Sequence, residues 1–235
     1  IYSMAKDGTD LVTLAAAGNT VPIAVDADNL YYGGASINQV PLAGGTATML
    51  ATPTTYAGAV AVDATDVYWV ESSSVNKIPI GGGTTAVLVT GTVGTTTIAL
   101  DSEFVYFGYS YNVYRTPLDG GSMTLLGTAS STVQDVELDG ASVYVAGGSV
   151  VRLALDGSTT QTLTTTSSTQ KLAVDADNVY FFNAGSLGRV SKNGGDVTVL
   201  AVDANARDLT VDDTTVYWTS GGEDGVTGAV MAVAK

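Results

Sequence analysis

The sequence predicts an all-β protein, a six-bladed β-propeller whose blades are four-stranded antiparallel sheets. A repeat of about 38 residues, found six times, is the first observation behind this prediction. The second is that each repeat contains short β-type runs separated by turn residues. The third is the length of 235 residues, which is enough for one large all-β domain. We therefore expect a single domain over residues 1–235.

An aspartate at the end of the first strand marks each repeat. It follows an aliphatic, a small and an aliphatic residue, and successive copies lie 37, 38, 38, 36 and 37 residues apart. A tyrosine stands five residues after each aspartate, and a large apolar residue usually follows it. The six aspartates are Asp26, Asp63, Asp101, Asp139, Asp175 and Asp212. A fixed period of this length indicates a repeat architecture.

Four β-type runs can be recognised in each repeat. The first run ends at the aspartate, the second carries the tyrosine, and a glycine turn joins the third to the fourth. Glycine suits these turns because it adopts the positive φ angles of tight hairpins. The first runs are Ile23–Val25, Val60–Val62, Ile98–Leu100, Val136–Leu138, Leu172–Val174 and Leu209–Val211. The third runs are Ile37–Leu42, Val75–Ile80, Val113–Leu118, Val150–Leu155 and Leu187–Lys192. No helix of any length fits between turns so closely spaced.

A four-stranded meander of this kind needs neighbours to be stable. Alone it would leave two open edges and two apolar faces in water. Several meanders packed around an axis bury those faces against one another, which is the arrangement of a propeller. A β-helix needs a shorter period, and a Greek-key sandwich needs long crossovers that the even spacing does not provide.

The two ends of the chain match the same part of the repeat. Residues 1–6 and 230–235 both match a third strand, and the N-terminal copy continues into a turn and a fourth strand. We expect the N-terminal strand to complete the last blade, because closure would remove unpaired edges. The duplication gives 25 predicted strands where six blades need 24. One copy is therefore expected to pair in the blade, and the other to be displaced, frayed or engaged with a neighbouring chain.

Two of the repeats carry a recognisable motif. The segments Val60–Asp63 with Val67–Trp69, and Leu209–Asp212 with Val216–Thr219, resemble repeats of YWTD-type and NHL-like six-bladed propellers. They resemble more closely the repeat-rich propellers of secreted or surface-attached bacterial proteins. The resemblance covers essentially the whole chain and implies ligand binding on the face where the 4→1 and 2→3 loops emerge. Ser220 replaces the final aspartate of the full motif, so the blade-linking role of that aspartate is not carried over.

The composition excludes several classes of function. With 9 Lys and Arg against 23 Asp and Glu, the net charge of −14 disfavours nucleic-acid binding. The absence of Cys and His excludes thiolate nucleophiles, Ser-His-Asp triads and the usual zinc sites. No apolar run approaches the ~20 residues of a membrane span. From composition and resemblance we expect a bacterial extracytoplasmic location, whether secreted, periplasmic or at the cell surface, and no cofactor or metal.

The residues that recur in every repeat are interpreted as scaffold. The aspartates are expected to cap turns through backbone N–H groups rather than to bind a metal. The tyrosines and their aromatic neighbours are expected to form the core between blades. Four third-strand cations are expected on a solvated strand face: Lys77, Arg115, Arg152 and Arg189.

Candidate functional residues are those that differ between repeats. Just before the repeated aspartate, repeats one to three have small or uncharged residues, whereas repeats four to six have charged ones. In a propeller these positions lie beside the central channel. The ligand-binding candidates there are Asp135, Glu137, Lys171, Arg207 and Asp208. The 2→3 loops add Glu71, Tyr109, Tyr111, Asn183 and the insertion 220–225. Aromatic rings beside carboxylates and amides suit a carbohydrate, a peptide or a small polar ligand.

Several functions remain open at this point. The preferred hypothesis is a non-catalytic binding or display module, with no catalytic residue assigned. One alternative is a propeller enzyme of the polysaccharide lyase, glycosidase or lactonase type, since Asp135 and Glu137 share one strand face. Another is a purely structural array in which the channel-mouth charges pair around water. A pairing of Glu137 with Lys171 would favour the structural alternative.

Overall fold

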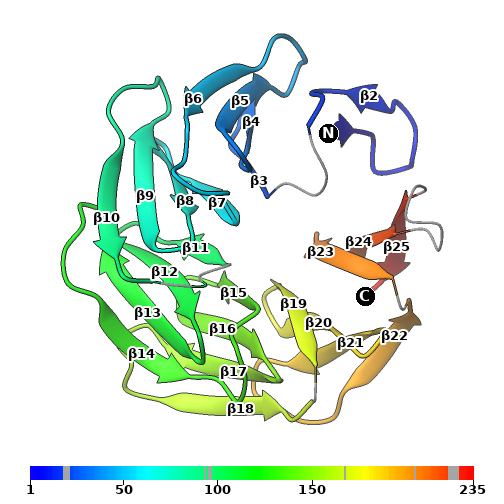
Figure 1. Ribbon diagram of the computed structural model, residues 1–235. Helices are drawn as coiled ribbons and strands as arrows, with labels where there is room; N and C mark the ends of the chain where they lie inside the picture. Colours follow the sequence, from blue (N-terminus) through cyan, green and yellow to red (C-terminus); the bar gives the residue numbers. More distant parts are fainter. Residues whose placement is uncertain (18–21, 93, 95–96, 167, 204, 222–227) are drawn as a thin grey trace. The chain divides into compact units, whose positions relative to one another are not determined.

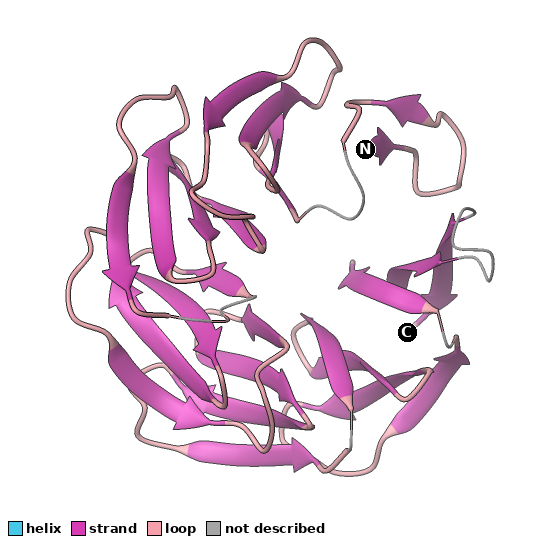
Figure 2. Ribbon diagram, in the orientation of Figure 1, coloured by secondary structure: helices cyan, strands magenta, loops and turns pink. Residues whose placement is uncertain are grey.

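The structure is a computed structural model that describes residues 1–17, 22–92, 94, 97–166, 168–203, 205–221 and 228–235. These residues form strands and turns, with no helix among them (Figure 2). The described residues contain 25 strands, the number that the repeat pattern predicts. The chain divides into two compact units: Ile1–Val105 with Thr116–Met123, and Tyr106–Arg115 with Thr124–Lys235. Each unit is described by itself.

The first unit begins with a small hairpin and continues into two complete sheets (Figure 1). The hairpin pairs β1 (Tyr2–Ser3) with β2 (Val12–Thr13). The first sheet contains β3 (Ile23–Val25), β4 (Asn29–Tyr32), β5 (Ile37–Pro41) and β6 (Thr48–Ala51). The second sheet contains β7 (Ala59–Val62), β8 (Asp66–Val70), β9 (Ser74–Pro79) and β10 (Ala86–Thr90). In both sheets neighbouring strands are consecutive and antiparallel, as a meander requires.

The third sheet has the same strand order, and its residues are divided between the two units. It contains β11 (Ile98–Leu100), β12 (Phe104–Tyr109), β13 (Asn112–Pro117) and β14 (Thr124–Thr128).

The second unit holds the remaining three sheets. The fourth sheet contains β15 (Asp135–Leu138), β16 (Ser142–Gly147), β17 (Ser149–Ala154) and β18 (Thr160–Thr164). The fifth sheet contains β19 (Thr169–Val174), β20 (Asn178–Asn183), β21 (Ser186–Ser191) and β22 (Thr198–Val202). The sixth sheet contains β23 (Ala206–Val211), β24 (Thr215–Gly221) and β25 (Gly228–Ala234). The predicted glycine turns are confirmed by positive φ angles, for example 82° at Gly194 and 126° at Gly195.

The apolar core lies between successive sheets. Tyr31 and Ile37 of the first sheet pack with Trp69 of the second. In the second unit, Tyr144 of the fourth sheet packs with Phe181 of the fifth. All these side chains are buried, and each contributes about 1.5–3 kcal/mol of hydrophobic stabilisation. The predicted role of the repeated tyrosines as core residues is confirmed for the first five of them, whereas Tyr217 is partly buried.

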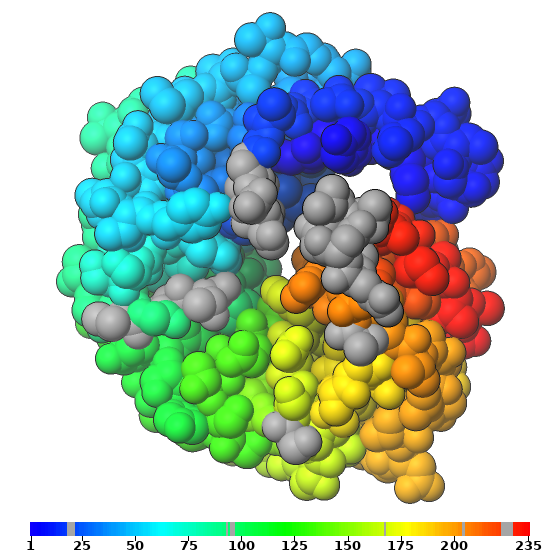
Figure 3. Space-filling model, turned by 45° about the vertical axis from the view of Figure 1, so that its right-hand side comes forward, coloured from blue at the N-terminus to red at the C-terminus, as the bar shows by residue number. Residues whose placement is uncertain are grey.

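The terminal strands differ in how they pair. β25 pairs with β24 from Thr215↔Ala234 to Gly221↔Gly228, so the C-terminal copy takes the third-strand position of the sixth sheet. The N-terminal copy pairs instead with Val12 and Thr13 in its own hairpin. β25 lies at the surface and most of its side chains are exposed (Figure 3). These pairings do not show the N-terminal strand completing the last blade, and that closure stays a prediction.

The repeated aspartate fixes its turn with both carboxylate oxygens. Oδ1 of Asp26 accepts hydrogen bonds from the N–H groups of Asp28 at 2.8 Å and Asn29 at 2.7 Å, and its Oδ2 accepts one from the Tyr31 hydroxyl at 2.8 Å. Burial opposes ionisation, but these donors outweigh it and lower the pKa of Asp26. Burial and the carboxylate together raise the pKa of Tyr31 to about 12. Turn capping is confirmed, and the bond to the tyrosine adds a link that the sequence did not predict.

The third-strand cations were expected on a solvated face, and this expectation is wrong. All four side chains are partly buried in their sheets. Arg115 Nη1 donates to the Leu155 carbonyl at 2.7 Å, and Arg152 Nε donates to Ser142 Oγ at 2.9 Å. The strand register explains the partial burial of Arg152, because this residue stands opposite the buried Tyr144 in the pairing of β16 with β17.

Candidate functional site

The candidate site lies on the first strands of three successive sheets in the second unit. β15 packs against β19, and β19 packs against β23. We call the charged residues on these strands the first-strand cluster: Asp135, Glu137, Lys171, Arg207 and Asp208. The structure therefore places on adjacent strands the five charged residues that the sequence singled out.

Asp135 joins the fourth sheet to the fifth. It is 8% exposed, and its Oδ2 accepts a hydrogen bond from the Leu172 N–H at 3.0 Å. Its Oδ1 lies 3.7 Å from Lys171 Nζ. A buried carboxylate needs such partners, because leaving it unpaired costs several kcal/mol. Both oxygens of Asp135 are thus engaged by the protein.

Glu137 is placed differently from Asp135. It lies two residues further along β15, on the same strand face, and is half-buried. Burial, followed by the negative charges of Asp135 and Asp208, raises its pKa to about 8, while Lys171 opposes the shift. Glu137 is therefore mostly protonated at neutral pH. Among the described residues the ion pair of Lys171 is with Asp135, so the Glu137–Lys171 pairing that would favour a structural role is not found.

Arg207 and Asp208 stand on the exposed part of β23. The register of β23 against β24 shifts between Ala206 and Asp208, which indicates a bulge. A bulge disrupts strand alternation, so the two adjacent side chains are both exposed. Asp208 Oδ1 accepts a hydrogen bond from the Leu209 N–H at 3.0 Å. These residues give the cluster a solvent-facing anion and cation.

Glu71 belongs to the second sheet and is built into the scaffold. It is 4% exposed and accepts hydrogen bonds from Trp69 Nε1 at 2.9 Å and Asn76 Nδ2 at 3.3 Å. The N–H groups of Thr54 and Thr55 donate to it at 3.0 and 3.2 Å, and the Thr54 hydroxyl also donates. Burial raises the pKa of Glu71, but these donors outweigh it and lower the pKa overall. Its carboxylate fastens the segment after β6 to the second sheet.

The remaining predicted residues lie near strand ends of the second unit. Tyr111 is 51% exposed in the β12–β13 turn, and the Tyr109 ring is centred 6.3 Å from the Tyr114 ring. Asn183 ends β20 and lines a cavity of about 350 Å³ with Phe181. Within the described residues, Asn183 Oδ1 is buried without a hydrogen-bond partner. Residues 222–225 of the predicted insertion lie outside the described part of the chain.

Comparison with known proteins identifies the fold. No protein-family model matches the chain, and no curated protein matches it. A chain of the nidogen/laminin complex matches at a TM-score of 0.65 with 16% identity, covering 75% of this chain and 78% of that one. The extracellular domain of BT4673 from B. thetaiotaomicron matches at 0.69 with 12% identity, covering 90% of this chain and 33% of that one.

The β-propeller domain of Doa1, a WD40 domain, matches at a TM-score of 0.73 with 12% identity, covering 94% of this chain and 84% of that one. The chain has the fold of a six-bladed β-propeller. At these identities the likeness shows the fold alone. The function of the propeller has to be argued from its own residues.

Metal binding finds no support in the described part of the propeller. No group of three or more acidic side chains there is arranged to hold a metal ion. The described residues also contain no helix long and apolar enough to cross a membrane.

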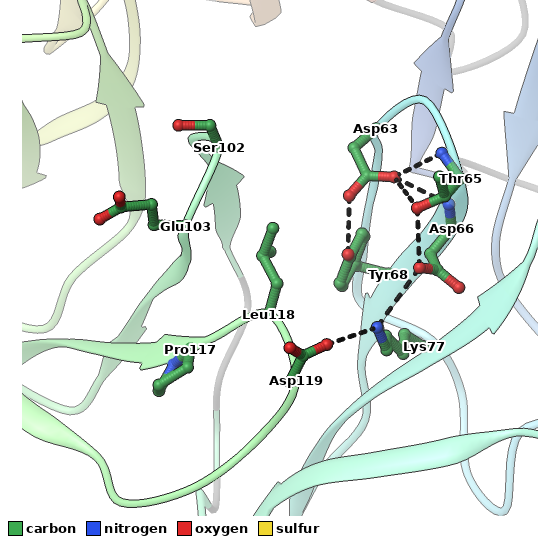
Figure 4. A pocket seen from close by; sticks show the side chains of 10 residues that line it. All are labelled: Asp63, Thr65, Asp66, Tyr68, Lys77, Ser102, Glu103, Pro117, Leu118 and Asp119. Atoms are coloured by element: carbon green, nitrogen blue, oxygen red, sulfur yellow. Dashed lines mark hydrogen bonds and ion pairs between the residues drawn. The ribbon is translucent and has the colours of Figure 1, made fainter.

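Sequence reasoning missed one cavity in the first unit. It is about 350 Å³ in volume and lies beside Asp63 and Tyr68 (Figure 4). A signal was present in the sequence: the residue after the third strand is lysine in the last two repeats, at Lys192 and Lys235, and apolar in the first four, where Leu118 is one of them.

Proposed function

We propose that the propeller is a non-catalytic binding module of a bacterial extracytoplasmic protein. We further propose that the first-strand cluster binds a polar ligand rich in hydroxyl groups, such as a carbohydrate. The observation that carries this proposal is that β15, β19 and β23 carry charged residues five, four or two positions before the repeated aspartate, whereas the same positions before Asp26, Asp63 and Asp101 are uncharged; at the position of Glu137 itself four of the six repeats have alanine. The scaffold tolerates alanine at this position, so it does not require the charges.

The cluster offers both donors and acceptors to a ligand. A protonated Glu137 donates one hydrogen bond and accepts others, while the exposed Asp208 carboxylate accepts and Arg207 donates. Hydroxyl groups also combine donor and acceptor roles. A carbohydrate therefore matches the cluster better than a simple anion or cation does.

The contacts of Asp135 favour binding over catalysis. A glycosidase of the usual kind needs two carboxyl groups that both reach the substrate. Asp135 is buried and engaged by Lys171 and the Leu172 N–H, which leaves Glu137 as the accessible member of the pair. The enzyme alternative keeps one supporting observation, the raised pKa of Glu137, which would suit a general acid.

The extracytoplasmic location is supported by the acidic, cysteine-free composition and by the likeness to the extracellular domain of BT4673. The terminal strands 1–6 and 230–235 carry the same phase of the repeat, so strand exchange with a neighbouring chain remains part of the proposal.

A glycan-binding screen tests the proposed function. The wild-type propeller would be screened with and without Ca²⁺, followed by the variants Glu137→Ala and Lys171→Met. We expect at least tenfold weaker binding of a detected glycan in Glu137→Ala, because alanine removes both the donor and the acceptors of the carboxyl group. Asp196→Asn is the control, since Asp196 is an exposed carboxylate after β21.

Three results would count against the proposal. They are the absence of any bound glycan, unchanged affinity in Glu137→Ala, and an equal loss in Asp196→Asn. Cleavage of a bound glycan, lost in Glu137→Ala, would replace the binding module with the enzyme alternative.

A further inference from the structure

A groove in the first unit corresponds to two positions in the second unit that are filled by lysine side chains. It lies between β7–β9 of the second sheet and the part of the third sheet in this unit, and has a volume of about 350 Å³ (Figure 4). We call it the Asp63 groove. Asp63, Asp66, Tyr68 and Lys77 line one side, with Leu118 beside them.

In the second unit, lysine side chains fill the corresponding position. Lys192 Nζ lies 2.7 Å from Asp139 Oδ2 and 5.3 Å from the centre of the Tyr144 ring. Lys235 Nζ lies 2.7 Å from Asp175 Oδ2 and 5.6 Å from the centre of the Tyr180 ring. In both cases the repeated aspartate and tyrosine of one sheet hold the ammonium of the next sheet.

Leu118 occupies the backbone position of these lysines. Each of them directly follows a third strand and donates its N–H to a carbonyl in the preceding turn of its own sheet. Lys192 donates to Asp177 at 2.9 Å, and Leu118 donates to Glu103 at 3.0 Å. Because the backbone is equivalent, the difference between the two grooves is the side chain. Leucine has no group that can donate to the aspartate.

The acceptor in the Asp63 groove is otherwise unchanged. Asp63 Oδ1 accepts from the turn, and Oδ2 accepts from the Tyr68 hydroxyl at 2.7 Å. In the filled groove, Asp139 Oδ2 accepts from Tyr144 at 2.9 Å and also from Lys192. A carboxylate oxygen accepts two hydrogen bonds readily. Among the described residues Asp63 Oδ2 has one donor where Asp139 Oδ2 has two.

The side chains that line the Asp63 groove carry a net negative charge, with Lys77 as the one cation among them. Lys77 Nζ lies 3.3 Å from Asp66, 3.8 Å from Asp119 and 5.8 Å from the centre of the Tyr68 ring. Lys77 stands opposite Tyr68 in the strand register, as Arg152 stands opposite Tyr144, so it occupies a different backbone position from Lys192. Asp63 and Glu103 add to the negative charge of the lining.

We propose that the Asp63 groove binds a primary alkylammonium group, supplied by a lysine side chain or by a small amine. The ammonium would donate to Asp63 Oδ2 and lie beside the Tyr68 ring, as Lys192 does at Asp139 and Tyr144. Leu118 contacts the alkyl chain. The site is separate from the first-strand cluster and shares no residue with it.

The test is an NMR titration with n-butylamine, which matches the lysine side chain, and with Nα-acetyl-lysine methylamide. We expect both probes to shift the Leu118 methyl and Tyr68 ring signals saturably and to compete with each other. Binding of n-butylamine alone would assign the site to small amines rather than to lysine in a peptide. The neutral analogue n-butanol should leave the signals unchanged.

Matched variants decide between this site and weak nonspecific binding. Leu118→Lys should weaken n-butylamine binding at least tenfold, because its own ammonium fills the groove, while Leu118→Met should bind like wild type. Lys192→Met should gain a second set of saturable shifts at Tyr144. Absence of saturable binding to wild type, or equal affinity in Leu118→Lys and Leu118→Met, would overturn the proposal. Circular dichroism verifies that each variant is folded.

The same titration separates this site from the proposed function. Glu137→Gln should bind n-butylamine as wild type does. Loss in this variant would assign amine binding to the first-strand cluster instead and overturn the Asp63 groove proposal.

Discussion

Replacing Glu71 tests whether a buried carboxylate fastens the segment after β6 to the second sheet. Glu71→Ala removes an ionised acceptor for Trp69 Nε1, Asn76 and the Thr54–Thr55 backbone. A hydrogen bond to a charged group contributes about 1.5–3 kcal/mol, and a buried donor left unpaired costs about 1–3 kcal/mol. Since these donors share one carboxylate and the contributions are not additive, we expect a loss of about 3–5 kcal/mol.

Thermal and urea unfolding measure this loss. A domain of this size shifts by about 2–4 °C per kcal/mol, so Glu71→Ala should lower Tm by about 6–20 °C. The Trp69 indole loses its acceptor, and tryptophan fluorescence of the folded variant should change as well. Glu103→Gln is the control, since Glu103 is exposed and its substitution should change stability by less than about 0.5 kcal/mol.

The pH dependence provides a further check on Glu71. Its pKa is lowered in the folded protein, so its stabilising contribution is complete above the unfolded pKa of about 4.3. The contribution disappears as the pH falls through the lower folded pKa. The stability gap between wild type and Glu71→Gln should therefore narrow on acidification. A Glu71→Ala variant within about 0.5 kcal/mol of wild type would refute the reasoning.

Two further predictions concern other carboxyl groups. Lys192→Met removes the partly buried ion pair with Asp139, and urea unfolding should show a loss of about 1 kcal/mol. NMR should show the Asp139 pKa rising from about 2, and an unchanged Asp139 titration would contradict the assigned pair. Glu137→Gln should be more stable than wild type by about 1–3 kcal/mol at pH 8, because burial raises the Glu137 pKa to about 8. Between about pH 4.3 and 8 the unfolded state ionises first, so the wild type should lose stability with rising pH and the variant should lose less; parallel urea curves across this range would contradict the shift.

The fold could be predicted because its signals are local. The aspartate, the tyrosine five residues later and the glycine turn lie within one repeat, and each acts on its own hairpin. The predicted first strand Leu209–Val211 begins at Ala206 in the structure. The bulge between Ala206 and Asp208 interrupts the alternation by which a strand is recognised, so its start could not be predicted.

The role of Glu71 could not be predicted, because two of its partners, Thr54 and Thr55, come before the first strand of its own repeat. A glutamate after a strand reads as a loop residue open to ligand. Thr54 and Thr55 lie 17 and 16 residues earlier, and the packing of the second sheet brings them to the carboxylate. The protein's own donors already occupy the Glu71 carboxylate, so a ligand would have to displace them in order to bind it.

The repeats act as controls for one another, and both proposed sites follow from this comparison. At the position of Glu137 the three first strands β3, β7 and β11, and also β19, have alanine, so the charge there is not required by folding. At the position of Leu118 two other repeats have a lysine that is held by aspartate and tyrosine. Leu42, Ile80 and Leu155 are also apolar at this position, so the lysines of the last two repeats, like the charge at Glu137, are additions to a shared scaffold. The amine site is assigned more narrowly than the site at Glu137 because the contacts of Lys192 and Lys235 show which group the aspartate and tyrosine accept, whereas no repeat shows a group bound at Glu137.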